Sequence, residues 1–257
     1  MNRTLQIAAP LVLVGVLLAA WEIACRTLHV PDYFLPPPSA IFAAGVANWS
    51  VLLASAWTTL SMALFALLTA SVAGTGLALL VSPNQLIESA VRPIAVALQV
   101  TPIVAVAPQA VIWSGLDHPE RAVVGLAAIV AFFPIFSGVL TGLKSADPDL
   151  ERLLDLYGAN RIQRLFRLRL PAATPFILEG HKVAAGLAIV GAVVAEFVAG
   201  SGSAQGLAWR ILESANRLQI AKEFAAVIML GLMGVALHAV LRIGERELLA
   251  RWRGRPT

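Results

Sequence analysis

One charge-rich run, residues 147–171, interrupts a chain that is otherwise almost entirely apolar, and its side chains are suited to contact another protein. The apolar residues of its first half recur at spacings of three and four, at Leu150, Leu153, Leu154 and Tyr157. On a helix this spacing forms one apolar stripe among charged neighbours. Gly158 predicts the end of that helix, and a second amphipathic helix is expected from Ala159 until Pro171 closes the run. The pattern favours a hinged pair of docking helices, and an amphipathic helix lying on the bilayer surface is the alternative.

A second group of polar residues lies inside an apolar segment that runs from about Val91 to Trp113. Three prolines and three polar residues interrupt this segment: Pro93, Pro102 and Pro108, with Gln99, Thr101 and Gln109. Prolines at membrane depth leave backbone carbonyls that must bond to protein or face a water-filled cavity. The segment is therefore a candidate wall of a substrate pathway. The alternative is a kinked packing helix whose polar side chains bond to neighbouring helices.

A single acid, Glu196, lies in the apolar stretch GAVVAEFVAG. An ionisable group inside a span costs roughly 2.5 to 3.5 kcal/mol on insertion scales and normally faces protein or water. We therefore place Glu196 near the outer mouth of the pathway, where its carboxylate is expected to bond to a neighbouring backbone or polar group. Because the polar segment 200–223 begins about one turn later, a simple position at the membrane interface is the alternative.

Sequence motifs of enzymes are absent from the chain. It contains neither HExxH nor GxSxG, and its histidines are scattered at His29, His118, His181 and His238. The segment GSGSAQG is no phosphate loop, since no Lys-Ser or Lys-Thr follows a suitably spaced glycine pair. The single cysteine, Cys25, excludes an internal disulfide framework and a thiolate metal cluster. We expect no catalytic residues, no metal and no cofactor bound by this chain.

The composition indicates an all-α polytopic membrane protein. Hydrophobic residues make up 58% of the chain and charged residues 13%, and several apolar runs approach the ~20 residues that a spanning helix needs. The net charge of +4 comes from basic residues that cluster at the edges of these runs, as the positive-inside rule expects. Nucleic acid is therefore not expected as a partner.

About six transmembrane helices are expected. They run from Leu5 to Ala20, within Leu52 to Val81, from about Val91 to Trp113, from Ala122 to Leu143 with a kink at Pro134, from about Phe176 to Ala199, and from about Phe224 to Leu241. The first is interpreted as an uncleaved span, because it ends in Trp21-Glu22 rather than in a small-residue cleavage site. Between the first two spans, Ser39 is expected to cap a short interfacial helix that ends at Trp49, and residues 200–223 are expected to form a polar loop.

The basic residues also predict an orientation. Placing the amino terminus in the cytoplasm puts most of the 19 lysines and arginines on the cytoplasmic side. With six spans, the carboxyl terminus and the loop 144–171 are then cytoplasmic as well.

The spacing within this loop resembles the cytoplasmic loop of ABC importer permeases, in which Glu-Ala-Ala is followed by three residues, Gly, nine residues, Ile, one residue and Leu-Pro. Here Gly158, nine residues, Leu168, one residue and Leu170-Pro171 match the second half. In the first half, Arg152-Leu153-Leu154 replaces Glu-Ala-Ala, and acids stand instead at Glu151 and Asp155. The loop alone therefore leaves open which side chain makes the acidic contact to the ATPase.

Further segments resemble permeases of the nitrate, sulfonate and taurine importer group, and also the related pyrimidine-precursor and riboflavin-type permeases. They are WEIACRTLHVPDYFLPPPSAI, LQVTPIVAVAPQAVIWSGL, AFFPIFSGVLTGLKSADPDL and GLAIVGAVVAEFVAG. The resemblance implies the transmembrane domain of a type I ABC importer in the inner membrane of a bacterial cell. Residues 1–50 would supply the first spanning helix and a periplasmic interfacial helix, and residues 51–257 the permease core with its coupling loop 144–171.

The resemblance also implies the partners and the residues of the site. Two ATPase subunits would bind the ATP, a periplasmic or lipid-anchored binding protein would deliver the solute, and a second permease copy would complete the pathway, most simply as a homodimer. Basic residues after the hinge would contact membrane lipid. Coupling to the ATPase is expected at Leu150, Leu153, Leu154, Asp155, Tyr157, Gly158 and Ala159. The pathway is expected at Gln99, Thr101, Pro102, Gln109 and Glu196.

The solute implied by the resemblance is a small anion of the sulfonate, taurine or nitrate kind, with a pyrimidine precursor or another small heterocycle as the alternative. Two other classes of protein remain open. A membrane-embedded hydrolase would need a nucleophile with a base or a metal pair. A channel or passive scaffold would not need a hinged cytoplasmic docking helix.

Overall fold

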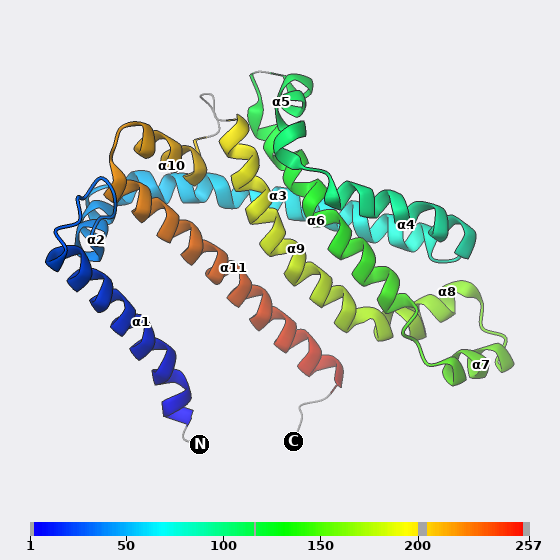
Figure 1. The fold of residues 1–257 in the computed structure, drawn as a ribbon. Coiled ribbons are helices and arrows are strands. Elements are labelled where there is room, and N and C mark those ends of the chain that lie inside the picture. The colour runs from blue at the N-terminus through cyan, green and yellow to red at the C-terminus, as the bar shows by residue number, and fades with distance from the viewer. Residues whose placement is uncertain (1–2, 116, 200–204, 254–257) are drawn as a thin grey trace. The chain divides into compact units, whose positions relative to one another are not determined.

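The computed structural model describes residues 3–115, 117–199 and 205–253, and all regular structure in these ranges is helical (Figure 1). The helices in chain order are α1 (Arg3–Thr27), α2 (Pro38–Ala47), α3 (Trp49–Val81), α4 (Gln85–Val100), α5 (Ile103–Ser114), α6 (Pro119–Leu143), α7 (Pro148–Leu156), α8 (Arg161–Arg164), the π-helix η1 (Leu165–Arg169), α9 (Leu170–Ala199), α10 (Leu207–Asn216) and α11 (Ile220–Arg253). The chain divides into two compact units: unit 1, of residues 1–57 and 205–232, and unit 2, of residues 58–204 and 233–257.

Several of these helices are suited to cross a membrane. Within the described ranges, four are long and apolar enough: Trp49–Val81, Pro119–Leu143, Arg161–Ala199 and Ile220–Glu247. α4 and α5 are long and apolar enough to cross a membrane only when they are taken together as one bent pair, which would be a fifth span. α1, the expected first span, is a helix of 25 residues but is not one of the four helices named above. The predicted all-α polytopic fold is confirmed, with six as an approximate count of spans.

The predicted third span is not one kinked helix. It breaks into α4 and α5, which are bent by 95° relative to each other at Thr101 and Pro102. A proline ring disfavours the helical conformation of the residue before it, and Thr101 is accordingly extended, with φ −66° and ψ 125°. Pro93 and Pro108, by contrast, lie inside their helices.

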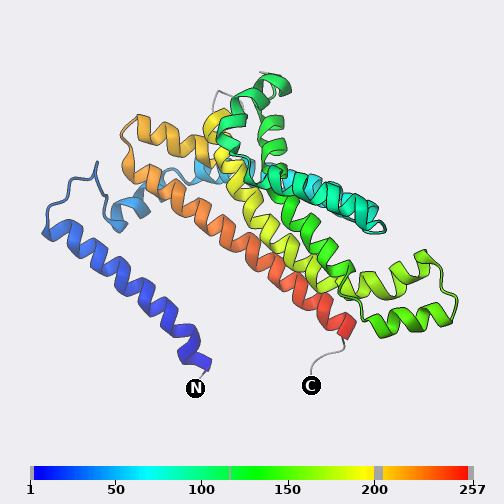
Figure 2. The same cartoon turned by 45° about the vertical axis from the view of Figure 1, so that its right-hand side comes forward.

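In unit 2, α6 and α9 lie side by side in direct backbone contact (Figure 1 and Figure 2). A Cβ atom at Gly180 would meet the carbonyl oxygen of Pro134 at 2.7 Å, and one at Gly142 would meet the Cβ of Ala173 at 2.8 Å. Only glycine fits such approaches, which small residues typically provide between membrane helices. Because α6 leads into the loop 144–171 and α9 leaves it, the loop is attached at both ends to one tightly packed helix pair.

The second helix of the loop does not end at Pro171 as predicted. Instead, α8, η1 and α9 follow one another without interruption, so that helix extends from Arg161 to Ala199. The amide of Leu170 donates to the carbonyl of Leu165, five residues back, which is the bond of a π-helix. A proline ring normally presses on the carbonyl four residues earlier. The wider π-turn directly before Pro171 relieves that clash, and the helix continues.

Unit 1 differs from the sequence prediction at α2. Pro37, not Ser39, precedes this helix as its N-cap, and Ser39 lies in the first turn. The amide of Ser39 donates to Glu22 of α1 at 3.0 Å, and its hydroxyl donates to the same carboxylate at 2.8 Å. A carboxylate at a helix N-terminus satisfies amides that have no partner within the helix. Glu22 therefore performs, from another helix, the capping role that was predicted for Ser39.

The predicted polar loop at 200–223 contains a helix, α10. Residues 200–204 of the GSGSAQG segment lie outside the described residues, and α10 begins at Leu207. Within unit 1, Arg210 of this helix donates to the hydroxyl of Ser55 at 3.0 Å and to Glu213 at 2.7 Å. The hydrogen bond from Arg210 is the main reason why the pKa of Glu213 lies below its usual value.

Candidate functional site

The helix α7 begins where the sequence supplies a strong start. Asp147 precedes it, and its carboxylate accepts a hydrogen bond from the amide of Asp149 at 2.8 Å. Pro148 occupies the first helical position, where no amide is needed, and Asp149 and Glu151 place negative charge in the first turn. A short, exposed helix is thus fixed at its amino end by local chemistry.

Gly158 ends α7, as predicted. Its φ is +66°, a left-handed conformation that costs residues with a side chain more than it costs glycine. The amide of Ala159 donates to the carbonyl of Leu154 at 2.9 Å, and the amide of Gly158 donates to that of Asp155 at 3.0 Å. These two bonds form a complete Schellman motif. The hinge is therefore a defined turn.

The chain re-enters helix at once after this turn. The side chain of Asn160 accepts from the amide of Gln163 at 2.8 Å, and the side chain of Gln163 accepts from the amide of Asn160 at 2.9 Å. This reciprocal pair is a capping box, here with asparagine as the first residue. Backbone hydrogen bonds hold the hinge on the α7 side, and side-chain to backbone hydrogen bonds hold it on the α8 side.

Two ion pairs cross the hinge and join the halves of the loop. Glu151 of α7 accepts from Arg169 of η1 at 2.6 Å, and Asp155 pairs with Arg164 of α8. These are the two acids that flank the Arg152-Leu153-Leu154 positions of the importer-like pattern. Each is engaged inside the loop, so the acidic residues stabilise the hinge and the apolar residues remain free to contact a partner.

The apolar residues of α7 form an exposed stripe, which we call the docking face: Leu150, Leu153, Leu156 and Tyr157. Leu156 is 86% exposed and Tyr157 is 81% exposed, and Leu150 and Leu153 are also exposed. Leu154 and Ala159 are half-buried, and Asp155 and Gly158 are exposed. The sequence prediction missed Leu156, although its spacing of three from Leu153 fits the same stripe.

The predicted pathway residues lie at different places in unit 2. Gln99, at the end of α4, lines a groove of about 390 Å³ against α6 and α9. We call it the polar groove after the polar side chains that line it with Gln99, namely Ser137, Thr141 and Glu179, although most of its lining surface is apolar. The apolar lining includes Phe133, Phe176 and Val183. Thr101 is exposed at the α4–α5 break and donates to the carbonyl of Ala97 at 2.8 Å. Pro102 and Gln109 are exposed but do not line the groove.

Glu196 lies apart from the polar groove, within the helix packing of unit 2. It is only 1% exposed, and its carboxylate accepts a hydrogen bond from the hydroxyl of Thr59 on α3 at 2.8 Å. Thr59 is itself fully buried. A buried carboxylate requires hydrogen-bonding partners, and this contact supplies one between two helices of the same unit.

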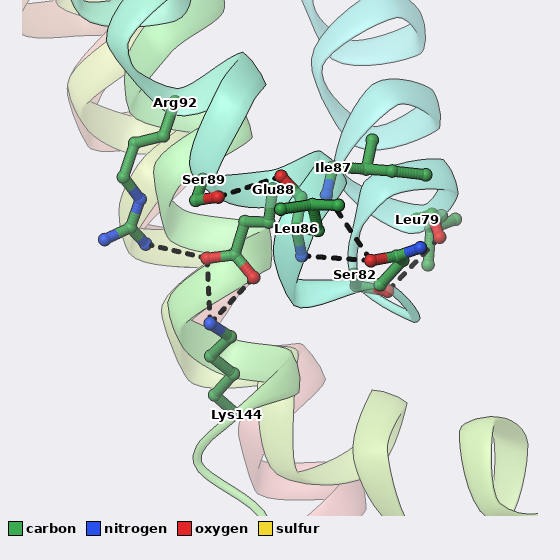
Figure 3. A network of polar contacts seen from close by, with 9 residues as sticks. Leu79, Ser82, Leu86, Ile87, Glu88, Ser89, Arg92 and Lys144 are labelled. Carbon is green, nitrogen blue, oxygen red and sulfur yellow. Dashed lines mark hydrogen bonds and ion pairs between the residues drawn. The ribbon is translucent and has the colours of Figure 1, made fainter.

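A third polar cluster, which the sequence analysis did not identify, joins α4 to the end of α6. Glu88 in the first turn of α4 is 5% exposed, and Lys144, the C-cap residue of α6, approaches both of its carboxylate oxygens at 2.7 and 2.8 Å. Figure 3 shows Arg92, one turn along α4, on the same carboxylate at 3.4 Å. Glu88 and Arg92 have helical pair spacing, but nothing in the sequence indicates that a lysine 56 residues later pairs with them.

Comparison with known proteins identifies the class of this chain. Residues 66–253 match the family described as binding-protein-dependent transport system inner membrane component. The chain belongs to this family. It is 32% identical to the formylaminopyrimidine transport permease protein ThiX of Halalkalibacterium halodurans, over 98% of this chain and 99% of that protein. It is 28% identical to the putative aliphatic sulfonates transport permease protein SsuC of Bacillus subtilis, over 95% and 87%. It is 29% identical to the taurine transport system permease protein TauC of Escherichia coli, over 97% and 91%.

Family membership confirms the resemblance to ABC importer permeases. The fold is the membrane domain of a type I importer, and the apolar helices make the chain a multi-pass protein of the inner membrane. Its relatives are permease subunits, which are components of transport systems and not enzymes. Among the described residues, no group of three or more His, Cys, Asp or Glu side chains is placed to hold a metal.

Proposed function

We propose that this permease forms the solute pathway of an ATP-driven importer and that the docking face binds a separate ATPase subunit, which holds the ATP. The exposure of the docking face carries the proposal. Large apolar side chains on an exposed helix are typical of an interaction surface, and Leu156 and Tyr157 lie next to the hinge. Glu151 and Asp155 are paired within the loop, so apolar contact would dominate the interface.

The loop is built to transmit motion of the ATPase to the membrane helices. The Schellman turn, the capping box and the two ion pairs join α7 to α8 and η1, and α9 continues directly from η1. The close contact of α6 with α9 then joins both ends of the loop. Nucleotide-driven closure of the ATPases would shift the permease by differential contacts with this loop in the two states.

The rest of the assembly follows the family. A second permease copy, most simply an identical one, would face this one across the pathway, and a binding protein would deliver the solute from outside. Both termini would be cytoplasmic. The Glu88–Lys144 pair brings the turn between α3 and α4 to the same end of unit 2 as the loop 144–171, as six spans with this arrangement require.

Gln99 and Thr101, beside the break at Pro102, are proposed to face the pathway, with Gln109 on the α5 side of the break. Glu196 would stabilise the outer part of the pathway through Thr59 without touching the solute. Polar side chains and a broken backbone at membrane depth are tolerated where they face water or protein. The polar groove extends this wall from Gln99 to Ser137, Thr141 and Glu179.

The lining of the polar groove favours an uncharged ring compound over an anion. Among the described residues that line it, Glu179 alone is charged. Lys182, which pairs with Glu179, also pairs with Glu245, so these three side chains together keep a net negative charge. Phe133 and Phe176 provide ring faces, and Gln99, Ser137 and Thr141 provide hydrogen bonds. A pyrimidine precursor, the kind of solute named for the relative ThiX, fits this lining better than a sulfonate, taurine or nitrate.

Reconstituted uptake tests the function. The permease would be placed in proteoliposomes with its ATPase and binding protein, and the uptake of labelled formylaminopyrimidine, taurine and nitrate would be measured with and without internal ATP. We expect uptake only when ATP and both partners are present, with the pyrimidine preferred. Uptake down a gradient without the ATPase would instead show a channel, and preference for taurine or nitrate would overturn the substrate assignment.

Thiol labelling tests the pathway residues. Single cysteines at Gln99 and Thr101, in a Cys25→Ser background, should react with a membrane-impermeant thiol reagent in at least one state trapped by nucleotide on the ATPase. A cysteine at Ala107, which is fully buried in α5, serves as the control and should stay unlabelled. Absence of labelling at 99 and 101 in every trapped state, together with normal uptake by both variants, would remove them from the pathway.

A further inference from the structure

We propose that Glu88 and Lys144 form a positioning pair that makes the pathway helix α4 move as one body with the coupling loop. The inference rests on the proposed function, because it assigns these two residues a role in carrying motion of the ATPase to the pathway. Neither residue lies on the docking face or in the polar groove. Their effect would be exerted entirely through the helices that they join.

The geometry is that of a strong, partly buried ion pair. The ammonium of Lys144 donates a hydrogen bond to one carboxylate oxygen of Glu88 at 2.8 Å and lies 2.7 Å from the other, which accepts no hydrogen bond (Figure 3). Glu88 is buried, whereas the side chain of Lys144 is 52% exposed. Removing one partner of a buried ion pair is costly, because it leaves a buried charge less well compensated. Without Lys144, only Arg92, at 3.4 Å, would remain beside the Glu88 carboxylate.

Each charge also lies at the helix end that favours it. Glu88 is in the first turn of α4, where the helix dipole is positive, and Lys144 follows the last residue of α6, where it is negative. Asn84 accepts hydrogen bonds from the amides of Leu86 and Ile87 and so fixes the start of α4 beside the pair. The pair therefore connects two well-formed helix ends, and displacement of one end moves the other.

The positions of the two residues along the chain give the pair its proposed role. Lys144 lies between the end of α6 and Asp147, the N-cap residue of α7, and is therefore at the start of the coupling loop. Ser145, next to it, donates to the carbonyls of Gly142 in α6 and Ala172 in α9. On the other side, α4 runs without interruption from Glu88 to Gln99 and then to the break at Thr101. One ion pair thus joins the first residue of the coupling loop to α4, the helix that ends at the proposed pathway.

Charge substitutions measure this role as a change in coupling. Glu88→Gln and Lys144→Gln would be reconstituted with the ATPase and binding protein, and ATP hydrolysis and uptake recorded in the same vesicles. We expect the number of ATP molecules hydrolysed per solute imported to be about fivefold or more higher in each variant than in the wild type. This increase is at the lower end of typical coupling effects. The Glu88→Lys, Lys144→Glu double variant should recover part of that loss, and not all, because both charges then oppose the helix dipoles. Arg92→Gln removes the more distant of the two cations, is the matched control and should leave the amount of ATP hydrolysed per solute imported unchanged.

A cross-linked variant covers the case in which the single variants fail to fold. Cysteines at 88 and 144, in the Cys25→Ser background, would be joined by a short thiol cross-linker in the assembled transporter. If the two residues move together, the linked transporter retains ATP-driven uptake, and loss of uptake on linking overturns the proposal. The proposal is also overturned if the wild type shows ATP-driven uptake and both single variants hydrolyse the same amount of ATP per solute imported as the wild type does. Absence of ATP-driven uptake in the wild type would instead show that the proposed function itself is wrong.

Discussion

Replacing Gly158 by valine should abolish most ATP-driven uptake while the permease still inserts into the membrane. The φ of +66° at this position disfavours any residue with a Cβ by roughly 1 to 2 kcal/mol, and a β-branched side chain is especially unsuited to it. A Cβ there would meet no atom of another part of the structure within 4 Å, so the cost comes from the local backbone conformation alone. The Schellman turn that orients the docking face would therefore be lost in a large share of molecules, since 1 to 2 kcal/mol is a factor of roughly 5 to 30 in a population.

Two further variants separate the turn from a general effect of substitution. Gly158→Asn should retain most uptake, because asparagine tolerates the left-handed conformation better than valine does. Gly186→Val, in the middle of α9, also places its side chain in open space and has no positive φ to preserve. Uptake and ATP hydrolysis would be measured for all three. Normal coupling in Gly158→Val would show that the hinge is not part of the ATPase contact.

Replacing Leu156 and Tyr157 by serine should largely prevent the ATPase subunit from binding. Both side chains are almost fully exposed in the permease alone, and tyrosine is one of the residue types enriched among the hot spots of protein interfaces. If they act as hot spots, each contributes about 2 kcal/mol or more, so each single change weakens binding by roughly thirtyfold. The affinity of the detergent-solubilised permease for the purified ATPase would be measured by surface-immobilised binding.

Ile162 provides the matched control for these substitutions. It is also an exposed apolar residue of the loop, but it lies in α8, outside the docking face. We expect Ile162→Ser to bind the ATPase as the wild type does. Equal loss of binding in all three variants would mean that the loop binds as a whole, and equal retention would remove α7 as the docking helix.

The sequence predicted the coupling loop well where local chemistry decides the structure. The spacing of Leu150, Leu153 and Tyr157 predicted a stripe on α7, and Gly158 predicted its end, because both depend only on residues close in the chain. Leu156 was missed because it lies at the edge of the stripe that Leu150, Leu153 and Tyr157 form, and spacing alone does not show whether a residue at that edge is exposed. The pair of Glu151 with Arg169, 18 residues apart, depends on the angle of the hinge, which no local pattern gives.

The prolines show where local rules were insufficient. Pro102 broke its helix completely, because Thr101 before it became extended. Pro171 did not, because a π-turn directly before it removed the clash that normally stops a helix. The Glu88–Lys144 contact depends on the packing of α4 against α6, and composition could indicate only that both residues lie near the ends of apolar runs.

Site-specific photo-cross-linking at position 156, in native membranes, tests most directly whether α7 is a docking helix for an ATPase. A photoreactive residue in place of Leu156 should give one major adduct, a protein that binds ATP, and the yield should change when nucleotide traps the ATPase. The same residue in place of Ile162 should give much less of that adduct. Adducts from position 156 that contain only membrane lipid, with no protein partner, would show that α7 lies on the bilayer surface and would contradict the account.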